Sequence, residues 1–530
     1  MAVVPRASSI ANSNRNGTAQ VIMKQAWAEV LLHGRWVFLA LISVALLIAC
    51  NGPASAQPRP PDVQALFVSD VHFEPFWDPG KAAALAAAPV SNWRSILESP
   101  ASPDREKGFS AIEKSCHMRG DDTSFPLFES ALREMRAHAR AAHFVTVSGD
   151  LIAHKFDCKY KLLFPGAKPG DYRAFVEKTI AFVTRELDRI APGAPVYIAL
   201  GNNDSDCGDY QLDEDGPFLA DIGPLLLRSV AKQERAEALE SFKQGGYYSV
   251  TLPAPVERTR LMVLNDVFLS PWHQNCAGKP DPAAGNAELE WLARQLAQAR
   301  SARERVWVMG HIPPGVDAYS TLAHTGEKCN ANPPTMFLAT DRLAQALTDA
   351  GDDVRLGIFG HAHTDEIKLL EPEQADAAPV SGEASSAKVA GSAVAVKMVP
   401  SISPINGNNP AFTVAQVDPS TARLADYRVY AAKDPSGAGV WPELYDFDRT
   451  YDEKSYSPEA VRRLLAELSA DRTGKTATSK SYMHDFLTGR PDILLPLVWP
   501  RYVCTLSHAT ASGFTYCACG ASPEGAAAAR

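Results

Sequence analysis

Several features that mark other classes of protein are scarce or missing in this sequence of 530 residues. Its nine cysteines include no pair in C-x-x-C spacing, which argues against a zinc site built from thiolates. Its formal net charge is −9, whereas proteins that bind nucleic acids usually carry a basic face. Its 46% of hydrophobic and 21% of charged residues are those of an ordinary globular protein. We therefore expect a large packed core and no nucleic-acid-binding surface.

The most apolar run, Trp36 to Cys50, has 15 residues and is short for a transmembrane helix. It follows Arg35 and precedes the small residues of ASAQ. A basic flank, an apolar run and an A-x-A site predict a secretory signal over residues 1–56, with Met23 as an alternative start, and hence a periplasmic or secreted protein. Two alternatives stay open. One is a membrane anchor. The other is a lipoprotein signal, which LIAC resembles, with an acylated Cys50 that tethers the mature protein to a membrane.

Removal of this signal changes two bulk properties. The first 56 residues contain four basic residues and one acidic residue, so the remainder carries a net charge of −12. That charge would not attract an anionic substrate, which would need a local positive centre such as a metal ion. Eight cysteines would remain, and an even number in an exported protein predicts disulfides, whose pairing the sequence does not fix.

Short aliphatic and β-branched runs recur along the chain without alternating with polar residues. This pattern is typical of strands buried on both faces. The segments between them carry apolar residues at helical spacing, and the alternation predicts an α/β architecture. The expected strands are residues 65–69, 143–148, 195–200, 260–265, 305–310, 354–360, 394–400, 412–417 and 425–432, and the expected helices are residues 126–142, 171–190, 287–300, 335–351 and 457–471.

The pattern also predicts the domain organisation. After the signal we expect a main α/β domain over residues 57–434, with an insertion at 78–125 that is long for a connection and could carry specificity. Residues 371–393, rich in Ala, Ser and Glu, are expected to form a surface loop. Residues 435–530 are helical in pattern and contain cysteines, and we expect them to form a C-terminal extension.

Five of the expected strands end in Asp, His or Asn. In open α/β sheets, ligands bind outside the carboxyl ends of the strands, so these side chains could converge on one crevice. Within D-x-H and H-x-H, residues two apart point the same way in extended backbone and can reach one ion. The seven side chains are those of Asp70, His72, Asp150, Asn202, His311, His361 and His363.

Histidine nitrogen and carboxylate oxygen are ligands that suit divalent transition metals. Seven such groups are too many for one tetrahedral ion and suit two ions that share a carboxylate. Each short motif alone is weak, because such pairs occur by chance. Five of them in chain order, each after an apolar run, make a strong joint signal. The mixed ligands admit zinc, manganese or iron.

The order D-x-H, GD, GN, GH and GHxH resembles that of the calcineurin-like metallophosphoesterases, over about residues 64–430. The resemblance implies a four-layer α/β/β/α sandwich and a dinuclear metal centre. It also implies a division of the ligands between the two ions: one held by Asp70, His72 and His363, the other held by Asn202, His311 and His361, and Asp150 bridging them.

A finer resemblance is to the acid sphingomyelinase-like phosphodiesterases. It rests on GDLIAH, which places His154 four residues after Asp150, on PSISPINGNNPAF (400–412), and on the helical, Cys-containing tail. It agrees with export and favours zinc. His154 is our candidate general acid, because imidazole titrates close to the working pH range. The alternative is a structural role, in which His154 caps a turn or binds backbone.

One position departs from the pattern of the family. Its usual motif has a histidine where this sequence has Asn203, in GNND. In the family that histidine contacts the phosphate and can help to protonate the leaving group. Asn203 can donate a hydrogen bond but no proton near neutral pH, which argues against a two-histidine acid mechanism in this chain. The candidate catalytic residues are therefore His154 and Asn203.

These inferences together predict an exported, metal-dependent phosphoesterase, most simply a phosphodiesterase, in which a hydroxide bridging two metal ions attacks phosphorus. Its substrate would be a small phosphate ester or a lipid headgroup. Two other functions stay open. One is a nucleotidase or general phosphomonoesterase. The other is a metal-binding surface lipoprotein that has lost catalysis, for which Asn203 and a possible anchor at Cys50 are the only support.

Overall fold

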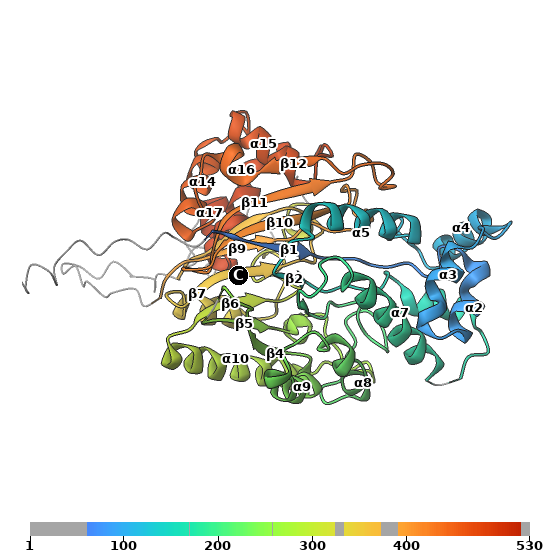
Figure 1. The fold of residues 1–530 in the computed structure, drawn as a ribbon. Coiled ribbons are helices and arrows are strands. Elements are labelled where there is room, and N and C mark those ends of the chain that lie inside the picture. The colour runs from blue at the N-terminus through green and yellow to red at the C-terminus, as the bar shows by residue number, and fades with distance from the viewer. Residues whose placement is uncertain (1–60, 169, 257, 324–332, 373–390, 521–530) are drawn as a thin grey trace, which may run out of the picture. The chain divides into compact units, whose positions relative to one another are not determined.

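The computed structural model describes residues 61–520 except residues 169, 257, 324–332 and 373–390. The predicted signal and Cys50 lie outside the described residues, as does most of the expected loop at 371–393. In the described part, two six-stranded sheets face each other and helices cover their outer faces (Figure 1). This is the four-layer sandwich that was expected.

The first sheet has the strand order β12-β11-β10-β1-β2-β3. Strands β1, β2 and β3 are parallel, and β10, β11 and β12 continue the sheet with antiparallel pairing. Every residue of β2 and β3 is buried, which explains why their sequences do not alternate. The strands are β1 (Val63–Val68), β2 (Phe144–Val147), β3 (Val196–Ile198), β10 (Ala411–Asp418), β11 (Arg423–Ala431) and β12 (Glu443–Asp446).

The second sheet has the strand order β4-β5-β6-β7-β9-β8. Its four central strands are parallel, and β4 and β8 pair antiparallel at the two edges. The strands are β4 (Tyr248–Thr251), β5 (Thr259–Val263), β6 (Arg305–Met309), β7 (Val354–Phe359), β8 (Ile367–Leu370) and β9 (Val394–Met398).

Trp307 of β6 packs between the two sheets. Its ring centroid lies 6.0 Å from that of Phe67 on β1 and 5.7 Å from that of Phe144 on β2. A buried indole needs a partner for its N–H, and this one donates to the carbonyl oxygen of Ala422 at 2.7 Å. The ring thus fills the space between the sheets without leaving a buried donor unpaired.

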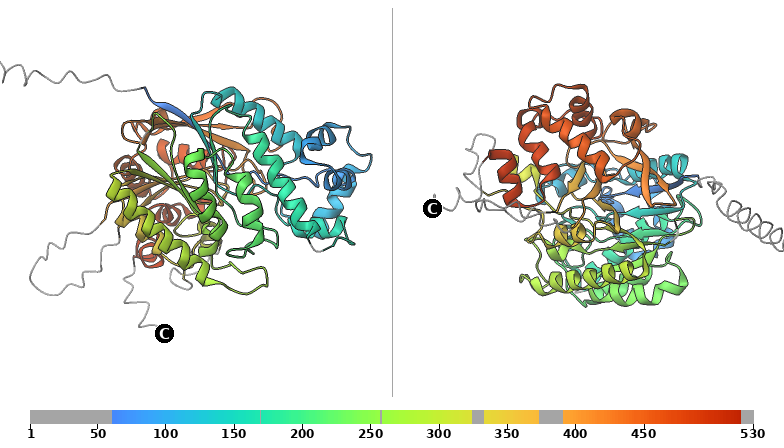
Figure 2. Two further views of the ribbon diagram at one scale, coloured as in Figure 1. Left: turned by 60° about the horizontal axis from the view of Figure 1, so that its bottom comes forward. Right: turned by 90° about the vertical axis from the view of Figure 1, so that its left-hand side faces the viewer.

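Helices form the two outer layers. Helix α5 (Phe125–Ala139) packs on β1 and β10, α10 (Pro282–Ala302) on β5 and β6, and α14 (Pro458–Ala470) on β8 and β9. The right-hand view of Figure 2 shows yellow-green α10 and the red C-terminal helices on opposite sides of the strands. None of the described helices is long and apolar enough to cross a membrane.

The remaining described helices connect these layers or belong to the insertion and the C-terminal extension. They are α2 (Ala82–Ala87), α3 (Trp93–Glu98), α4 (Arg105–Ser115), α6 (Phe156–Leu163), α7 (Asp171–Leu187), α8 (Pro217–Leu226), α9 (Lys232–Gly245), α11 (Ala318–Leu322), α12 (Arg342–Asp349), α13 (Phe447–Tyr451), α15 (Ala477–Phe486), α16 (Leu495–Ser507) and α17 (Ala511–Cys519), with 3-10 helices η1 (Pro79–Lys81), η2 (Val90–Asn92) and η3 (Asp266–Leu269).

The expected helix at 335–351 was wrong in its first part. Helix α12 begins at Arg342, because the preceding residues bond to other segments of the chain. The amide of Phe337 donates to the carbonyl oxygen of Gly315 at 3.0 Å, and that of Ala339 donates to that of Leu269 at 2.8 Å. These long-range backbone bonds take the place of helical ones.

Strands β4, β8 and β12 were not expected. Each has four residues and contains polar or charged side chains, so none of them stands out as an apolar run. Strand β12 lies inside the expected C-terminal extension and pairs with β11. The extension therefore contributes a strand to the first sheet as well as helices.

Three disulfides between residues that the structure describes confirm the expectation drawn from the cysteine count. They join Cys116 to Cys158, Cys207 to Cys276, and Cys504 to Cys517. The first links the end of α4, in the insertion, to α6, which follows the second strand of the main domain. It therefore holds the insertion against the part of the chain that follows Asp150.

The Cys116–Cys158 disulfide should contribute more stability than Cys504–Cys517. The two bonds close loops with sequence separations of 42 and 13 residues, and loop-closure entropy predicts contributions of about 4 and about 3 kcal/mol. The measurement is urea unfolding of the two paired Cys→Ser variants. A smaller loss for the Cys116 and Cys158 variant than for the Cys504 and Cys517 variant would contradict this ranking.

Candidate metal centre

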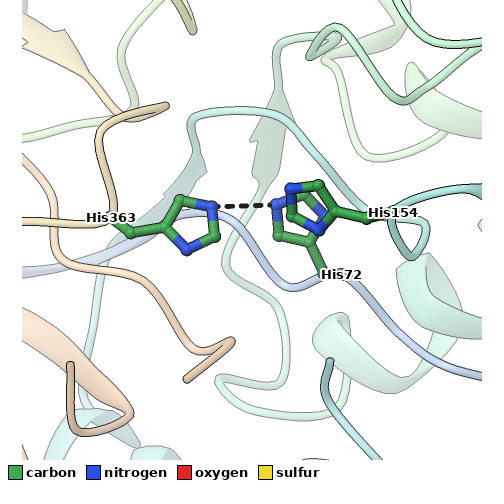
Figure 3. Close-up of side chains that lie close together, drawn as sticks. All are labelled: His72, His154 and His363. Atoms are coloured by element: carbon green, nitrogen blue, oxygen red, sulfur yellow. Dashed lines mark hydrogen bonds between the residues drawn. The ribbon is translucent and has the colours of Figure 1, made fainter. Parts of the chain in front are cut away.

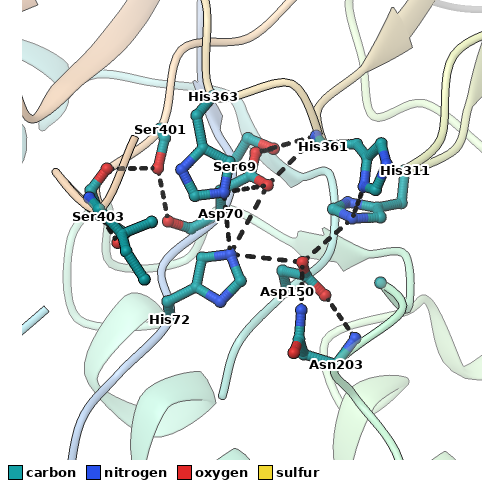
Figure 4. A network of polar contacts seen from close by, with 12 residues as sticks. Ser69, Asp70, His72, Asp150, Asn203, His311, His361, His363, Ser401 and Ser403 are labelled. Carbon is teal, nitrogen blue, oxygen red and sulfur yellow. Dashed lines mark hydrogen bonds and ion pairs between the residues drawn. The ribbon is translucent and has the colours of Figure 1, made fainter. Parts of the chain in front are cut away.

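The polar residues at the strand ends stand on an unusual backbone. Five of the seven have positive φ, with values of 49° at Asp70, 42° at His72, 56° at Asp150, 71° at His361 and 63° at His363. Residues other than glycine rarely adopt this conformation, and where they do it often marks a functional site. The chain thus turns sharply after β1, β2 and β7, and each turn presents its side chain at the same edge of the sandwich (Figure 4).

Glycines allow the close approach of these turns. A Cβ atom at Gly201 would collide with the Asp150 carboxylate, and one at Gly360 would collide with Ser69 and Asp70. The glycines in GNND and GHAH are therefore required by packing against the two carboxylates.

One cluster of side chains consists of Asp70, His72 and His363, and is called the first cluster below. The Nε2 atoms of His72 and His363 lie 3.1 Å apart. Oδ1 of Asp70 lies 3.4 Å from Nε2 of His363 and 3.8 Å from Nε2 of His72. All three side chains are buried. Two nitrogens and one carboxylate oxygen thus converge on one point.

A second cluster consists of Asn202, His311 and His361. Nε2 of His311 lies 3.1 Å from Oδ1 of Asn202 and 3.2 Å from Nδ1 of His361. Asp150 lies between the two clusters. Its Oδ2 atom is 3.3 Å from Nε2 of His72 and 3.2 Å from Nε2 of His311. One carboxylate oxygen therefore faces both clusters.

Hydrogen bonds behind the clusters aim the ligand atoms. Nδ1 of His72 lies 3.0 Å from the carbonyl oxygen of Ile152, and Nδ1 of His311 lies 2.6 Å from that of Ser148. Each ring therefore donates through Nδ1, which leaves Nε2 available to a cation. The amide nitrogen of Asn202 donates to Asp209 at 2.8 Å, which turns Oδ1 of Asn202 towards His311.

Electrostatics divides the four histidines into two pairs. Burial opposes protonation of His72, but Asp150 and Asp70 raise its pKa to about 9. Burial also opposes protonation of His311, and Asp150 raises its pKa to about 10. Burial lowers the pKa of His361 and of His363 to about 3, so these two rings are neutral. The positive charges of protonated His72 and His311 thus offset the negative charges of the buried carboxylates.

The donor set fits two divalent cations. A bound cation would take the place of the protons on His72 and His311, because metal ligands must be deprotonated. The atoms offered are imidazole nitrogen, carboxylate oxygen and one amide oxygen, which zinc, manganese and iron accept. The two clusters contain the residues that the family resemblance assigned to the two ions, and the division of ligands between the ions stays a prediction.

His154 lies beside the first cluster. Its ring stacks on that of His72, with centroids 3.9 Å apart and planes 22° apart (Figure 3). The ligand atoms of His154, His72 and His363 all lie within 4.8 Å of one another. The His154 side chain is 28% exposed, whereas His72 is fully buried. It is thus placed to meet a substrate that approaches from solvent.

Asn203 points into the site and not out of it. Its backbone N–H donates to Oδ1 of Asp150 at 2.8 Å, and its side-chain amide donates to Oδ2 of Asp150 at 2.9 Å (Figure 4). Both bonds go to the carboxylate that the two clusters share. Asn203 therefore orients Asp150 in this structure.

Several residues of the site were not predicted from the sequence. Asp122, in the insertion, lies 3.0 Å from Nδ1 of His154. The hydroxyl of Tyr210 lies 3.3 Å from Nε2 of His361. Asp204 accepts the N–H groups of Leu151 and Gly201 and so fixes the turn after Asp150. Asp122 and Tyr210 do not follow an apolar run, so the sequence gives no signal for them. Asp204 is the last residue of GNND, but the motif does not reveal that its carboxylate accepts backbone N–H groups.

The family model described as calcineurin-like phosphoesterase matches residues 64–365. The chain is 28% identical over 260 residues to sphingomyelinase phosphodiesterase C of Dictyostelium discoideum. That alignment covers 48% of this chain and 50% of the Dictyostelium protein. It is 23% identical over 410 residues to acid sphingomyelinase-like phosphodiesterase 3b of Homo sapiens. That alignment covers 75% of this chain and 80% of the human protein.

The chain is 23% identical over 363 residues to cyclic GMP-AMP phosphodiesterase SMPDL3A of Homo sapiens, which covers 66% of this chain and 70% of that one. Among solved structures, a dimetal phosphatase from Danio rerio matches with 13% identity and a TM-score of 0.37, over 75% of this chain and 100% of that one.

Proposed function

The chain belongs to the calcineurin-like phosphoesterase family, and we propose that it is an exported phosphodiesterase with a two-metal centre. The observation that carries the proposal is the position of Asp150, one oxygen of which faces both clusters at 3.3 and 3.2 Å. Two-metal hydrolases hold their ions a few ångströms apart, and a shared carboxylate suits that spacing. The similar proteins that are named as phosphodiesterases support the choice of a diester.

The proposed ligands follow the two clusters. Asp70, His72 and His363 would hold one ion, Asn202, His311 and His361 the other, and Asp150 would contact both. When bound, two divalent ions would supply positive charge to the phosphoryl group and activate the attacking water. We propose zinc, with manganese and iron as the alternatives that metal analysis would distinguish.

The protein's own residues then have distinct tasks. His154 is the proposed general acid, because its partly exposed ring borders the first cluster and can deliver a proton to a leaving oxygen. Asn203 is proposed to hold the Asp150 carboxylate in place through its two hydrogen bonds. It supplies no proton, so a single acid is proposed where the family pattern has two histidines.

The proposed substrate class is a phosphodiester with a small or lipid-borne headgroup. The similar proteins are named for sphingomyelin and for cyclic GMP-AMP, which share a phosphodiester and differ in everything attached to it. The net charge of −9 means that the metal ions, and not the protein surface, would attract the anionic group.

A hydrolysis panel on the mature protein tests this function, with metal content measured in parallel. The panel contains bis-nitrophenyl phosphate, nitrophenyl phosphate, nitrophenylphosphorylcholine, sphingomyelin and ATP, and protein stripped by a chelator is the control. We expect about two metal ions per chain and cleavage of the diesters that is lost on chelation and restored by zinc.

Other outcomes of the panel would redirect the proposal. Faster cleavage of nitrophenyl phosphate and ATP than of the diesters would make the protein a phosphomonoesterase or nucleotidase. Two bound metal ions without cleavage of any ester would favour a binding protein, and would point to Asn203 as the position where catalysis was lost.

Export is supported by the three disulfides, which form and persist in oxidising compartments. Acylation of Cys50 is a separate proposal. Mass spectrometry of the mature N-terminus distinguishes a chain that begins with a lipid-modified Cys50 from one cleaved after Ala56.

A further inference from the structure

Asp122 belongs to the insertion and yet is buried beside the candidate general acid. It lies between α4 and α5, and its side chain is fully shielded from solvent. The next residue, Thr123, donates its N–H to the carbonyl oxygen of His72 at 3.1 Å and accepts the N–H of Glu74 at 2.9 Å. The backbone that carries Asp122 is thus paired with the backbone that carries the metal ligand His72.

Both oxygens of Asp122 accept hydrogen bonds from His154. Oδ1 lies 3.0 Å from Nδ1 of the ring, and Oδ2 accepts the backbone N–H at 2.8 Å. Ser403 donates its hydroxyl to Oδ1 at 3.0 Å. This two-point attachment fixes both the position of residue 154 and the direction of its ring, and it requires the proton on Nδ1 when the ring is neutral.

A buried charge network supports Asp122 from behind. The Nζ atom of Lys159 lies 3.6 Å from Oδ2 of Asp122 and is also ion-paired with Glu74. All three side chains are fully buried. Buried charges are costly unless they are paired, and here Lys159 supplies the cation that two buried carboxylates need.

We propose that Asp122 is a positioning residue of the reaction, which holds His154 so that Nε2 faces the leaving group while Nδ1 stays protonated. The inference rests on the proposed function of His154 as the acid. It assigns the insertion a part in catalysis, because the carboxylate that orients the acid comes from residues 78–125. The carboxylate acts through His154 and does not touch the substrate.

An Asp122→Asn substitution tests the proposal, because an amide cannot replace this carboxylate. The His154 backbone N–H, the His154 ring, the Ser403 hydroxyl and the Lys159 ammonium all face its oxygens as donors, so an NH₂ group at either position would meet a donor. Ser403→Ala is the matched control, since it removes one donor and leaves the carboxylate and His154 in place. The substrates are methyl nitrophenyl phosphate and methyl phenyl phosphate, which differ only in how much their leaving groups need a proton.

We expect Asp122→Asn to lower kcat/KM for the phenyl ester by about 30-fold and for the nitrophenyl ester by less than about 3-fold. Ser403→Ala should change both by less than about 3-fold. Metal content should equal that of the wild type, and imidazole ¹⁵N shifts should show loss of the Nδ1–H tautomer of His154. In a background with His154→Gln, Asp122→Asn should have no further effect on the phenyl ester.

Two results would overturn the inference while the wild-type protein stays active and the proposed function stands. One is an equal loss of kcat/KM for both esters in Asp122→Asn. The other is a loss of bound metal in Asp122→Asn. The latter would mean that the network serves the metal centre and not the acid. A wild-type protein that binds metal but cleaves neither ester would overturn the proposed function and this inference together.

Discussion

Asp150→Asn should lower kcat/KM for bis-nitrophenyl phosphate by at least about 10³-fold, because it removes the one charge that both clusters share. The amide cannot reproduce the carboxylate in either orientation. An NH₂ group at Oδ1 would face the backbone N–H of Asn203, and one at Oδ2 would face the Asn203 amide and two histidine nitrogens. We therefore expect fewer than two metal ions per chain as well as the loss of turnover.

Asp209→Asn is the matched control for this variant. It also removes a carboxylate charge beside the second cluster, but its amide oxygen can still accept the hydrogen bond from Asn202. Loss of a supporting group behind a metal ligand usually costs about 10- to 100-fold, and we expect the lower figure here. Circular dichroism would establish that both variants fold. An Asp150→Asn protein that keeps two metal ions and a tenth of its activity would refute the shared-carboxylate site.

His154→Gln should separate substrates by their leaving groups. Loss of a general acid costs about 10²- to 10⁴-fold where the leaving oxygen needs a proton, so we expect about 10²-fold for methyl phenyl phosphate. Nitrophenolate leaves without help, and its ester should lose less than about 10-fold. Glutamine keeps a hydrogen-bond donor at this position but no transferable proton. The measurement is kcat/KM for the two esters at saturating zinc.

Metal content decides how this result is interpreted. The nitrogens of His154, His72 and His363 lie within 4.8 Å of one another, so His154 also has the position of a possible ligand. Unchanged metal content with selective loss on the phenyl ester supports the acid. Equal losses on both esters would rule the acid out, and a fall in bound metal would assign His154 to the first cluster.

The convergence of the seven strand-end residues could be inferred from the sequence for a physical reason. Buried parallel strands appear as apolar runs, and the residues that follow them must lie at one edge of the sheets. Asp70, Asp150 and His311 are therefore visible as polar residues two or three positions after the ends of β1, β2 and β6. The fold follows from the same runs, since β5, β6 and β7 were all close to their expected positions.

What remained hidden depends on contacts between distant segments. Asp122 of the insertion bonds to His154, 32 residues further along the chain, and Asp209 bonds to Asn202 across a turn. Helix α12 begins at Arg342 because backbone groups before it bond to other loops. Strand β12 has too few apolar residues to be seen without its partner β11. Periodicity in a single sequence predicts local secondary structure. These features depend instead on contacts between residues that are distant in the sequence.

The strand order of the first sheet has a consequence for synthesis. Strand β1 lies between β2 and β10, and Val63 pairs with Val417. One edge of β1 therefore stays open until the ribosome has passed residue 418, and closing so long a loop makes contact order high and folding slow. We therefore expect the first sheet to be completed only late in translation. Late completion of the sheet would suit the proposed export, because the chain could then cross a membrane before its first sheet is complete.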